Sequence, residues 1–161
     1  MIRSMIEKVF HVQPWTPKIQ EVAQSLINEI HVTNPELEIL FMGAAALGLP
    51  GKNDIDLDIL CRQDDVKDYT HKLLPTLGLP KEADDNLAMW DFKYQGFDID
   101  AILSDPSTSH VPEQRRVFEK LKADPDLLNE YRELKIACDG LSYATYEERK
   151  KVFFIERVLD Q

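Results

Sequence analysis

Two short segments of the chain carry aspartates at alternating positions. Asp54, Asp56 and Asp58 alternate with apolar residues in DIDLDIL, and Asp98 and Asp100 do the same in FDIDAIL. On a β-strand, residues two apart lie ~6–7 Å apart at Cα and project to the same side of the sheet. The oxygens of such carboxylates can converge on a hard cation such as Mg²⁺. The spacing therefore makes all five aspartates candidate metal ligands.

The alternative interpretation is that these aspartates form the solvated outer faces of half-exposed strands. Carboxylates that share one face repel each other unless water or a counter-charge separates them. Two acidic strands side by side would also suit a pair of metal ions ~3.5–4 Å apart, the arrangement used in phosphoryl and nucleotidyl transfer. The repetition of the pattern on a second strand favours a metal site over a solvated face.

The glycine-rich segment before the first acidic strand does not form a P-loop. That motif requires Gly, four residues, Gly-Lys and then Ser or Thr. Counting back from Gly51 gives Ala46 at the first glycine position, and Asn53 follows Lys52. We interpret the segment from Gly43 onwards as a turn after a strand. Lys52 is then either a phosphate contact, as a point charge, or an ordinary loop lysine.

The elements that must position these residues follow from hydrophobic periodicity and from helix start signals. The apolar pattern predicts a helix that starts at Thr16-Pro17, and Asn34-Pro35 ends it. A second helix is expected at 64–74, where Pro75 interrupts it. Three further helices begin at Pro112, at Asp124-Pro125 and at Thr145, the last with Glu148 in a capping box. Strands are expected at 37–42, 54–60, 88–94 and 97–103.

Together these elements predict a single α+β domain over residues 1–161. It would consist of a small mixed sheet with helices packed on one face and a C-terminal helical segment. A net charge of −10 disfavours binding to long nucleic acid, which needs clustered Lys and Arg. No apolar stretch is long enough for a membrane span. The N-terminal stretch lacks the apolar core of a secretory signal, so we expect a cytoplasmic protein.

The segment MGAAALGLPGKNDIDLDIL resembles the signature of the DNA-polymerase-beta-type nucleotidyltransferase superfamily. In that signature a strand ends in Gly-Ser or Gly-Gly, and Asp-hydrophobic-Asp follows after a spacer. Gly43 takes the glycine position, and a third acid from a later strand is best matched by Asp100, with Asp98 as its rival. The resemblance implies a nucleotidyltransferase-like fold, catalytic carboxylates and nucleotide binding near Gly43, Ala44 and Lys52.

A closer resemblance, to the GrpB family within that fold, covers nearly the whole chain. GLPGK is similar to a loop of that family, and YRELKIAC and YATYEERKKVFFIERVL are similar to its C-terminal helices. Two departures matter. Ala44 stands where the superfamily has a serine that contacts the triphosphate. The loop is also about one residue shorter than in the usual GrpB form, so either Asp54 or Asp58 is the partner of Asp56.

The leading hypothesis from the sequence is a metal-dependent nucleotidyltransferase. Its catalytic residues would be Asp54, Asp56 and Asp100, with Mg²⁺ or Mn²⁺ as cofactor, and an NTP and an unknown, small acceptor as substrates. A non-catalytic module that binds a nucleotide or a partner protein is the alternative, and Ala44 favours it. An interaction protein with merely solvated acidic strands is the third possibility.

Overall fold

The computed structural model describes residues 8–159 of the chain. Its centre is a five-stranded mixed sheet in the order β1-β2-β5-β4-β3. β2 and β5 run parallel, and the other neighbouring pairs are antiparallel. The strands are β1 (Glu38–Met42), β2 (Asp54–Leu60), β3 (Glu82–Ala83), β4 (Leu87–Tyr94) and β5 (Phe97–Ser104).

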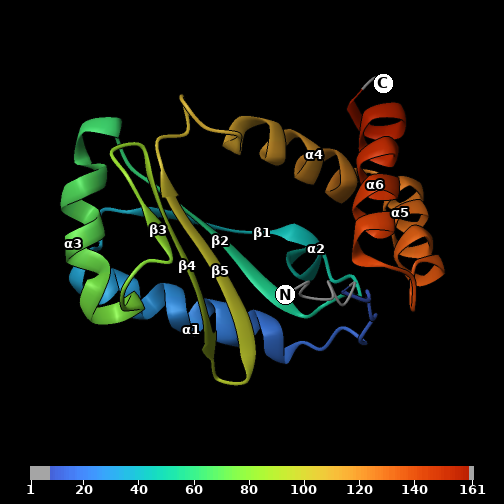
Figure 1. Ribbon diagram of the computed structural model, residues 1–161, viewed down its shortest axis with the longest axis horizontal. Coiled ribbons are helices and arrows are strands. Elements are labelled where there is room, and N and C mark those ends of the chain that lie inside the picture. Colours follow the sequence, from blue (N-terminus) through green and yellow to red (C-terminus); the bar gives the residue numbers. More distant parts are fainter. Residues whose placement is uncertain (1–7, 160–161) are drawn as a thin grey trace, which may run out of the picture.

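Helices lie on both sides of the sheet (Figure 1). The first part of the chain contributes α1 (Lys18–Thr33), the short α2 (Gly43–Ala46), a 3-10 turn η1 (Gln63–Asp65) and α3 (Val66–Leu77). The last third contributes α4 (Val111–Ala123), α5 (Pro125–Ala137) and α6 (Tyr143–Phe153), which continues as a π-helical segment η2 (Phe154–Leu159). Among the residues that the structure describes, no helix is both long and apolar enough to cross a membrane.

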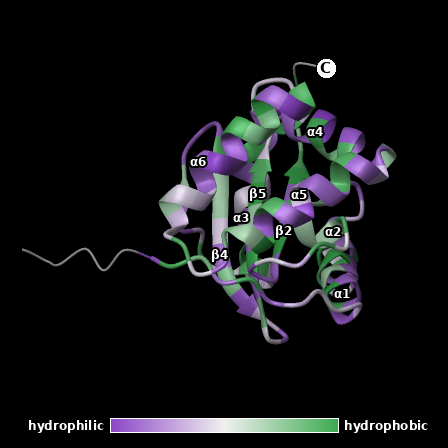
Figure 2. Ribbon diagram, turned by 90° about the vertical axis from the view of Figure 1, so that its right-hand side faces the viewer, coloured by the Kyte–Doolittle hydropathy of each residue, from purple (hydrophilic) through white to green (hydrophobic). Residues whose placement is uncertain are grey.

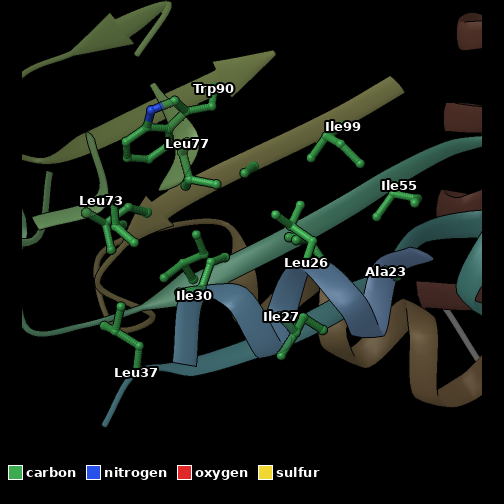
Figure 3. Packing of buried hydrophobic residues seen from close by; sticks show 14 of the residues in the cluster. Ala23, Leu26, Ile27, Ile30, Leu37, Ile55, Leu73, Leu77, Trp90 and Ile99 are labelled. Carbon is green, nitrogen blue, oxygen red and sulfur yellow. The ribbon is translucent and has the colours of Figure 1, made fainter. Parts of the chain in front are cut away.

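The main hydrophobic core lies between one face of the sheet and the helices α1 and α3. Figure 3 shows Leu26 and Ile30 of α1 beneath Ile55 of β2 and Ile99 of β5. Alternation along both strands directs these apolar side chains into the core and leaves the aspartates on the opposite face. Trp90 of β4 closes one end of the core, and its indole N–H donates to the Gly78 carbonyl at 2.9 Å.

The three C-terminal helices form a separate packing unit at the other end of the sheet (Figure 1). Figure 2 shows that these helices carry both hydrophilic and hydrophobic residues. The segment before α1, from residue 8 onwards, connects this unit to the rest of the molecule. The Phe10 ring stacks on Tyr146 with 3.8 Å between centroids, and its backbone bonds with Gly140 and Leu141.

The predicted α+β class is confirmed, including the mixed sheet and the C-terminal helical segment. Two local predictions are wrong. α3 continues through Pro75 to Leu77, because a proline in the last turn removes only one backbone hydrogen bond. The cap of α6 is Ser142 rather than Thr145, since the Ser142 hydroxyl accepts from the Thr145 backbone N–H at 3.1 Å. By contrast, Asp124 caps α5 as its sequence predicts.

Candidate functional site

Three aspartates from two neighbouring strands meet on the face of the sheet opposite the core. Asp54 and Asp56 come from β2, and Asp100 comes from β5. The parallel register pairs Asp56 directly with Asp100, so their carboxylates lie side by side. One carboxylate oxygen from each of the three residues lies within 4.8 Å of the others. At this spacing the three oxygens can coordinate one small metal ion.

A glycine makes room for this carboxylate group. Gly43 follows β1, whose last residue, Met42, is paired with Asp56. Its φ of +81° is in the left-handed region, which other residues rarely adopt. A Cβ atom on Gly43 would collide with Oδ2 of Asp56. The turn at Gly43 therefore brings the backbone against the central carboxylate, which a larger residue would displace.

The electrostatics of the three aspartates favour a bound cation. Burial, together with the charges of Asp54 and Asp100, raises the pKa of Asp56 to about 7. Burial and the charge of Asp54 also raise the pKa of Asp100. Like charges held this close in a partly dry site are destabilising without a counter-charge. Hard oxygen donors in this number are what Mg²⁺ or Mn²⁺ binds, so the residues present fit such an ion.

The other two candidate aspartates lie outside this group. Asp98 is exposed, and its Oδ1 accepts from Lys93 Nζ at 2.9 Å. Asp58 lies two residues further along β2 than Asp56, and only 5% of it is exposed. Burial raises the pKa of Asp58. The sequence left open whether Asp54 or Asp58 is the partner of Asp56. In the structure Asp54 lies with Asp56 and Asp100, whereas Asp58 does not.

Lys52 lies beside the three aspartates. Its Nζ is 3.3 Å from Oδ2 of Asp54 and donates to the Tyr143 hydroxyl at 3.0 Å. Burial lowers the pKa of Lys52, but the hydrogen bond with Tyr143 and the charge of Asp54 outweigh it, so the net shift is upward. Lys52 is therefore a fixed positive charge at the edge of the site.

A second lysine, which no motif in the sequence singled out, is buried nearby. Only 4% of Lys135 on α5 is exposed, and its Nζ donates to the Tyr146 hydroxyl at 2.8 Å. Burial lowers the pKa of Lys135 to about 8, and the charge of Lys150 acts in the same direction. A signal was present in the sequence. Leu127, Tyr131 and Lys135 follow one helical stripe, so a lysine occupies a core position.

One cavity of about 960 Å³ lies between the acidic face of the sheet and the C-terminal helices. Its wall includes the three-residue group of aspartates, Asp58 and both lysines. Gly43, Ala44 and Lys52 lie on its wall with the aspartates. Apolar residues of α4 and η2 line another part, including Phe118, Leu121 and Phe154. The volume falls in the range of small-molecule sites, which hold a few polar groups in a mainly apolar wall.

The fold and the site define an α+β protein with an acidic three-residue cluster on adjacent parallel strands and a lysine-bearing cavity beside it. No model of a known protein family matches the chain. A UPF0157 protein of Vibrio cholerae serotype O1 is 32% identical over 138 residues, which is 83% of this chain and 71% of that protein. The chain belongs to the UPF0157 family.

Two solved structures of Cid1 share parts of the arrangement. One, described for its RNA terminal uridylyl transferase activity, has a TM-score of 0.45 at 16% sequence identity. The match covers 76% of this chain and 43% of the Cid1 chain. The other, a poly(U) polymerase with MgGTP bound, has a TM-score of 0.43 at 16% sequence identity. That match covers 76% of this chain and 44% of the Cid1 chain. This chain thus spans less than half the length of either structure.

Proposed function

We propose that this protein is a metal-dependent nucleotidyltransferase in which Asp54, Asp56 and Asp100 hold Mg²⁺ or Mn²⁺. The observation that carries the proposal is the convergence of three carboxylate oxygens within 4.8 Å, from two strands whose register pairs Asp56 with Asp100. The space left by Gly43 supports it, because the backbone there accommodates the Asp56 carboxylate. The resemblance of this segment to the nucleotidyltransferase signature points the same way.

In the proposed reaction an acceptor hydroxyl attacks the α-phosphorus of an NTP. The new bond is the P–O bond to the acceptor, the bond between the α- and β-phosphates breaks, and pyrophosphate leaves. Asp100 accepts the proton of the acceptor hydroxyl, since burial and the charge of Asp54 raise its pKa and make it a better base. The bound cation supplies charge stabilisation for the phosphoryl oxygens.

The lysine side of the cavity is where we place the phosphates. Lys52 and Lys135 both line it, and Gly51 lies against the Lys135 side chain, where a Cβ would come 3.0 Å from Cε. Lys52 is held by Asp54 and Tyr143, so its ammonium is oriented before a ligand arrives. Two positive groups in a partly buried wall give phosphate oxygens charge-assisted hydrogen bonds.

Ala44 favours a second candidate function, a module on the same fold that binds a nucleotide without turning it over. The resembled signature has serine at this position, and Ala44 lines the cavity without a hydroxyl to donate. Such a module would still bind a nucleotide against Lys52 and Lys135. It would release no pyrophosphate with any acceptor.

We further propose that residues 1–161 act as one GrpB-like domain in the cytoplasm. The net charge of −10 supports a small acceptor rather than a long RNA, whose phosphates this surface would repel.

The test is a calorimetric titration of the full chain with a non-hydrolysable NTP analogue, with and without Mg²⁺. We expect saturable binding that requires Mg²⁺ in the wild type and is lost in Asp56→Asn. The matched control is Asp98→Asn, which removes a carboxylate from β5 outside the three-residue group and should keep the wild-type affinity.

Three outcomes decide between the candidates. Metal-dependent binding of the analogue, with pyrophosphate released from a natural NTP in a parallel assay, supports the transferase. Binding that survives Asp56→Asn, without pyrophosphate release across a panel of hydroxylated small molecules, favours the non-catalytic module. Absence of both metal and nucleotide binding in the wild type rejects both candidates.

A further inference from the structure

The charged groups are spread unevenly over the wall of the cavity. Its lysines come from the loop before β2 and from the helices α5 and α6, namely Lys52, Lys135, Lys150 and Lys151. Glu147 and Glu148 of α6 also line the cavity, and Oε1 of Glu147 accepts from Lys150 Nζ at 3.0 Å. His110 and Glu113, at the start of α4, and Asp58 of β2 line the cavity as well. Arg115 and Arg116 follow on α4 but are exposed and do not line the cavity. The part of the cavity near Asp58 therefore suits a positively charged ligand group.

Asp58 is unusual among the acidic residues of this wall. It lines the cavity although only 5% of the residue is exposed. Within residues 8–159, its Oδ2 atom has no hydrogen-bond partner. Oδ2 is also almost inaccessible to water, but rotation about the terminal torsion of an aspartate is soft and can turn either oxygen to the cavity.

A buried carboxylate without a partner is unfavourable unless another group supplies a hydrogen bond or an opposite charge. His110 is close enough for its charge to act on Asp58, but it is exposed at the start of α4. A ligand ammonium in the cavity would supply both a charge and donor hydrogens. Native proteins rarely leave such a group unpaired, so Asp58 needs a partner, and a ligand in the cavity is one candidate.

We propose that Asp58, with His110 close to it, anchors a protonated amine on the acceptor substrate. This inference rests on the proposed transferase function, and it names the acceptor as a small hydroxylated amine. The amine binds and orients the acceptor, whose hydroxyl then lies towards Asp100. An RNA end is disfavoured here, because its phosphates would meet the carboxylates of Asp58 and Glu113.

Ser104 offers a purely internal explanation for Asp58. Its Oγ is likewise buried without a partner among the described residues, and alternation places it on the same face of the sheet. A small rotation that joined Ser104 to Asp58 would satisfy both groups without a ligand. The experiment must therefore separate amine binding from this internal hydrogen bond.

The experiment is an NMR titration of the isotopically labelled full chain with three probes of similar size: ethanolamine, ethylene glycol and glycolate. In the wild type we expect ethanolamine to bind at least about tenfold more tightly than ethylene glycol, because a hydrogen bond to a charged group is worth about that factor. Glycolate should not shift the resonances of this region. Asp58→Asn should remove the preference for ethanolamine, and Glu119→Gln, an exposed acid on α4 outside the cavity, should retain it.

A second variant keeps the test valid if Asp58→Asn does not fold. His110→Lys, at an exposed position, places a permanent charge beside Asp58 and should weaken ethanolamine binding. Equal affinity for ethanolamine and ethylene glycol in the wild type would overturn the proposal, as would unchanged ethanolamine binding in Asp58→Asn.

Mn²⁺-induced line broadening, recorded on the same samples, separates this inference from the proposed function. We expect Asp58→Asn to retain Mn²⁺ binding. Loss of Mn²⁺ in that variant would make Asp58 a metal ligand and overturn the amine site. Absence of Mn²⁺ binding in the wild type would reject the transferase instead, while the preference for ethanolamine would still report on Asp58.

Discussion

Gly43 and Asp56 lie so close that the carboxylate of one occupies the place where a side chain of the other would be. The contact joins the end of β1 to the middle of β2, where Met42 and Asp56 are paired. The positive φ of Gly43 thus lets the backbone turn next to the central carboxylate. The acidic group depends on a residue that carries no chemistry of its own.

Replacement of Gly43 by alanine should therefore damage both the fold and the site. Gly48→Ala is the matched control, because Gly48 has a similar φ of +75° but no atom within 4 Å of the place where its Cβ would lie. We expect the control to lower the free energy of unfolding by about 1 kcal/mol through backbone strain. Gly43→Ala should lose a further ~1–3 kcal/mol from the collision, and ~10-fold or more in Mn²⁺ affinity. Urea denaturation and Mn²⁺ titration measure both, and equal losses in the two variants would argue against the contact.

Much of this site follows from the sequence. Strict alternation in both acidic segments predicted their strands, and the helical pattern of the C-terminal third predicted α4 to α6. The register could not be predicted, because nothing in the two segments says that Asp56 is opposite Asp100 rather than Asp98. Only the pairing of the parallel strands separates the exposed Asp98 from the three-residue group.

Lys135 illustrates a different limit. Its place on an apolar helical stripe was readable, but the groups that satisfy its ammonium come from distant parts of the chain. Tyr146 lies on the next helix and Phe10 near the N-terminus, and their rings lie 5.1 and 5.7 Å from Nζ. Long-range packing of this kind leaves no local pattern, so a sequence can indicate that the lysine is buried without indicating its neighbours.

The stability of the metal-free protein should depend on the ionisation of Asp56. Burial and the neighbouring aspartates raise its pKa to about 7 from 3.8. The folded state therefore binds this proton more tightly than the unfolded state, and the associated stability is full below about pH 4 and lost as the pH rises through about 7. We expect the free energy of unfolding to fall by on the order of 2–4 kcal/mol more in the wild type than in Asp56→Asn across this window. Denaturation curves without metal measure it, and parallel pH profiles would contradict the shift.

Added Mg²⁺ should reverse that loss. At pH 8 the carboxylates are ionised, so a bound cation removes their repulsion and stabilises the folded state by mass action. We expect Mg²⁺ to raise the melting temperature of the wild type at pH 8 and to have little effect at pH 5. A shift of the same size at both pH values would indicate binding elsewhere.

Lys135 should show the opposite pH dependence. Burial lowers its pKa to about 8 from 10.5, so the unfolded chain binds this proton more tightly. The associated stability is present above about pH 10.5 and is lost as the pH falls through about 8. At pH 7 we expect Lys135→Met to stabilise the metal-free fold by on the order of 2 kcal/mol and to weaken binding of the NTP analogue. A stabilised variant with wild-type nucleotide affinity would place the phosphates away from Lys135.

Ala44→Ser tests the departure from the resembled signature. Ala44 lines the cavity next to Gly43, so a hydroxyl there can donate to a phosphate oxygen. One added hydrogen bond should tighten binding of the NTP analogue by roughly 2- to 10-fold. Ala44→Val is the control, since it adds bulk without a donor and should not strengthen binding. Weaker binding in both variants would show that the phosphates do not approach this turn.

The most direct test of the central claim is anomalous diffraction from crystals grown with Mn²⁺. We predict a peak between Asp54, Asp56 and Asp100, with each of the three residues contributing an oxygen at a distance typical of a metal ligand. Crystals of Asp56→Asn should lack the peak. A map without a peak at these carboxylates at saturating Mn²⁺, or with its only peak beside Asp98, would contradict the account.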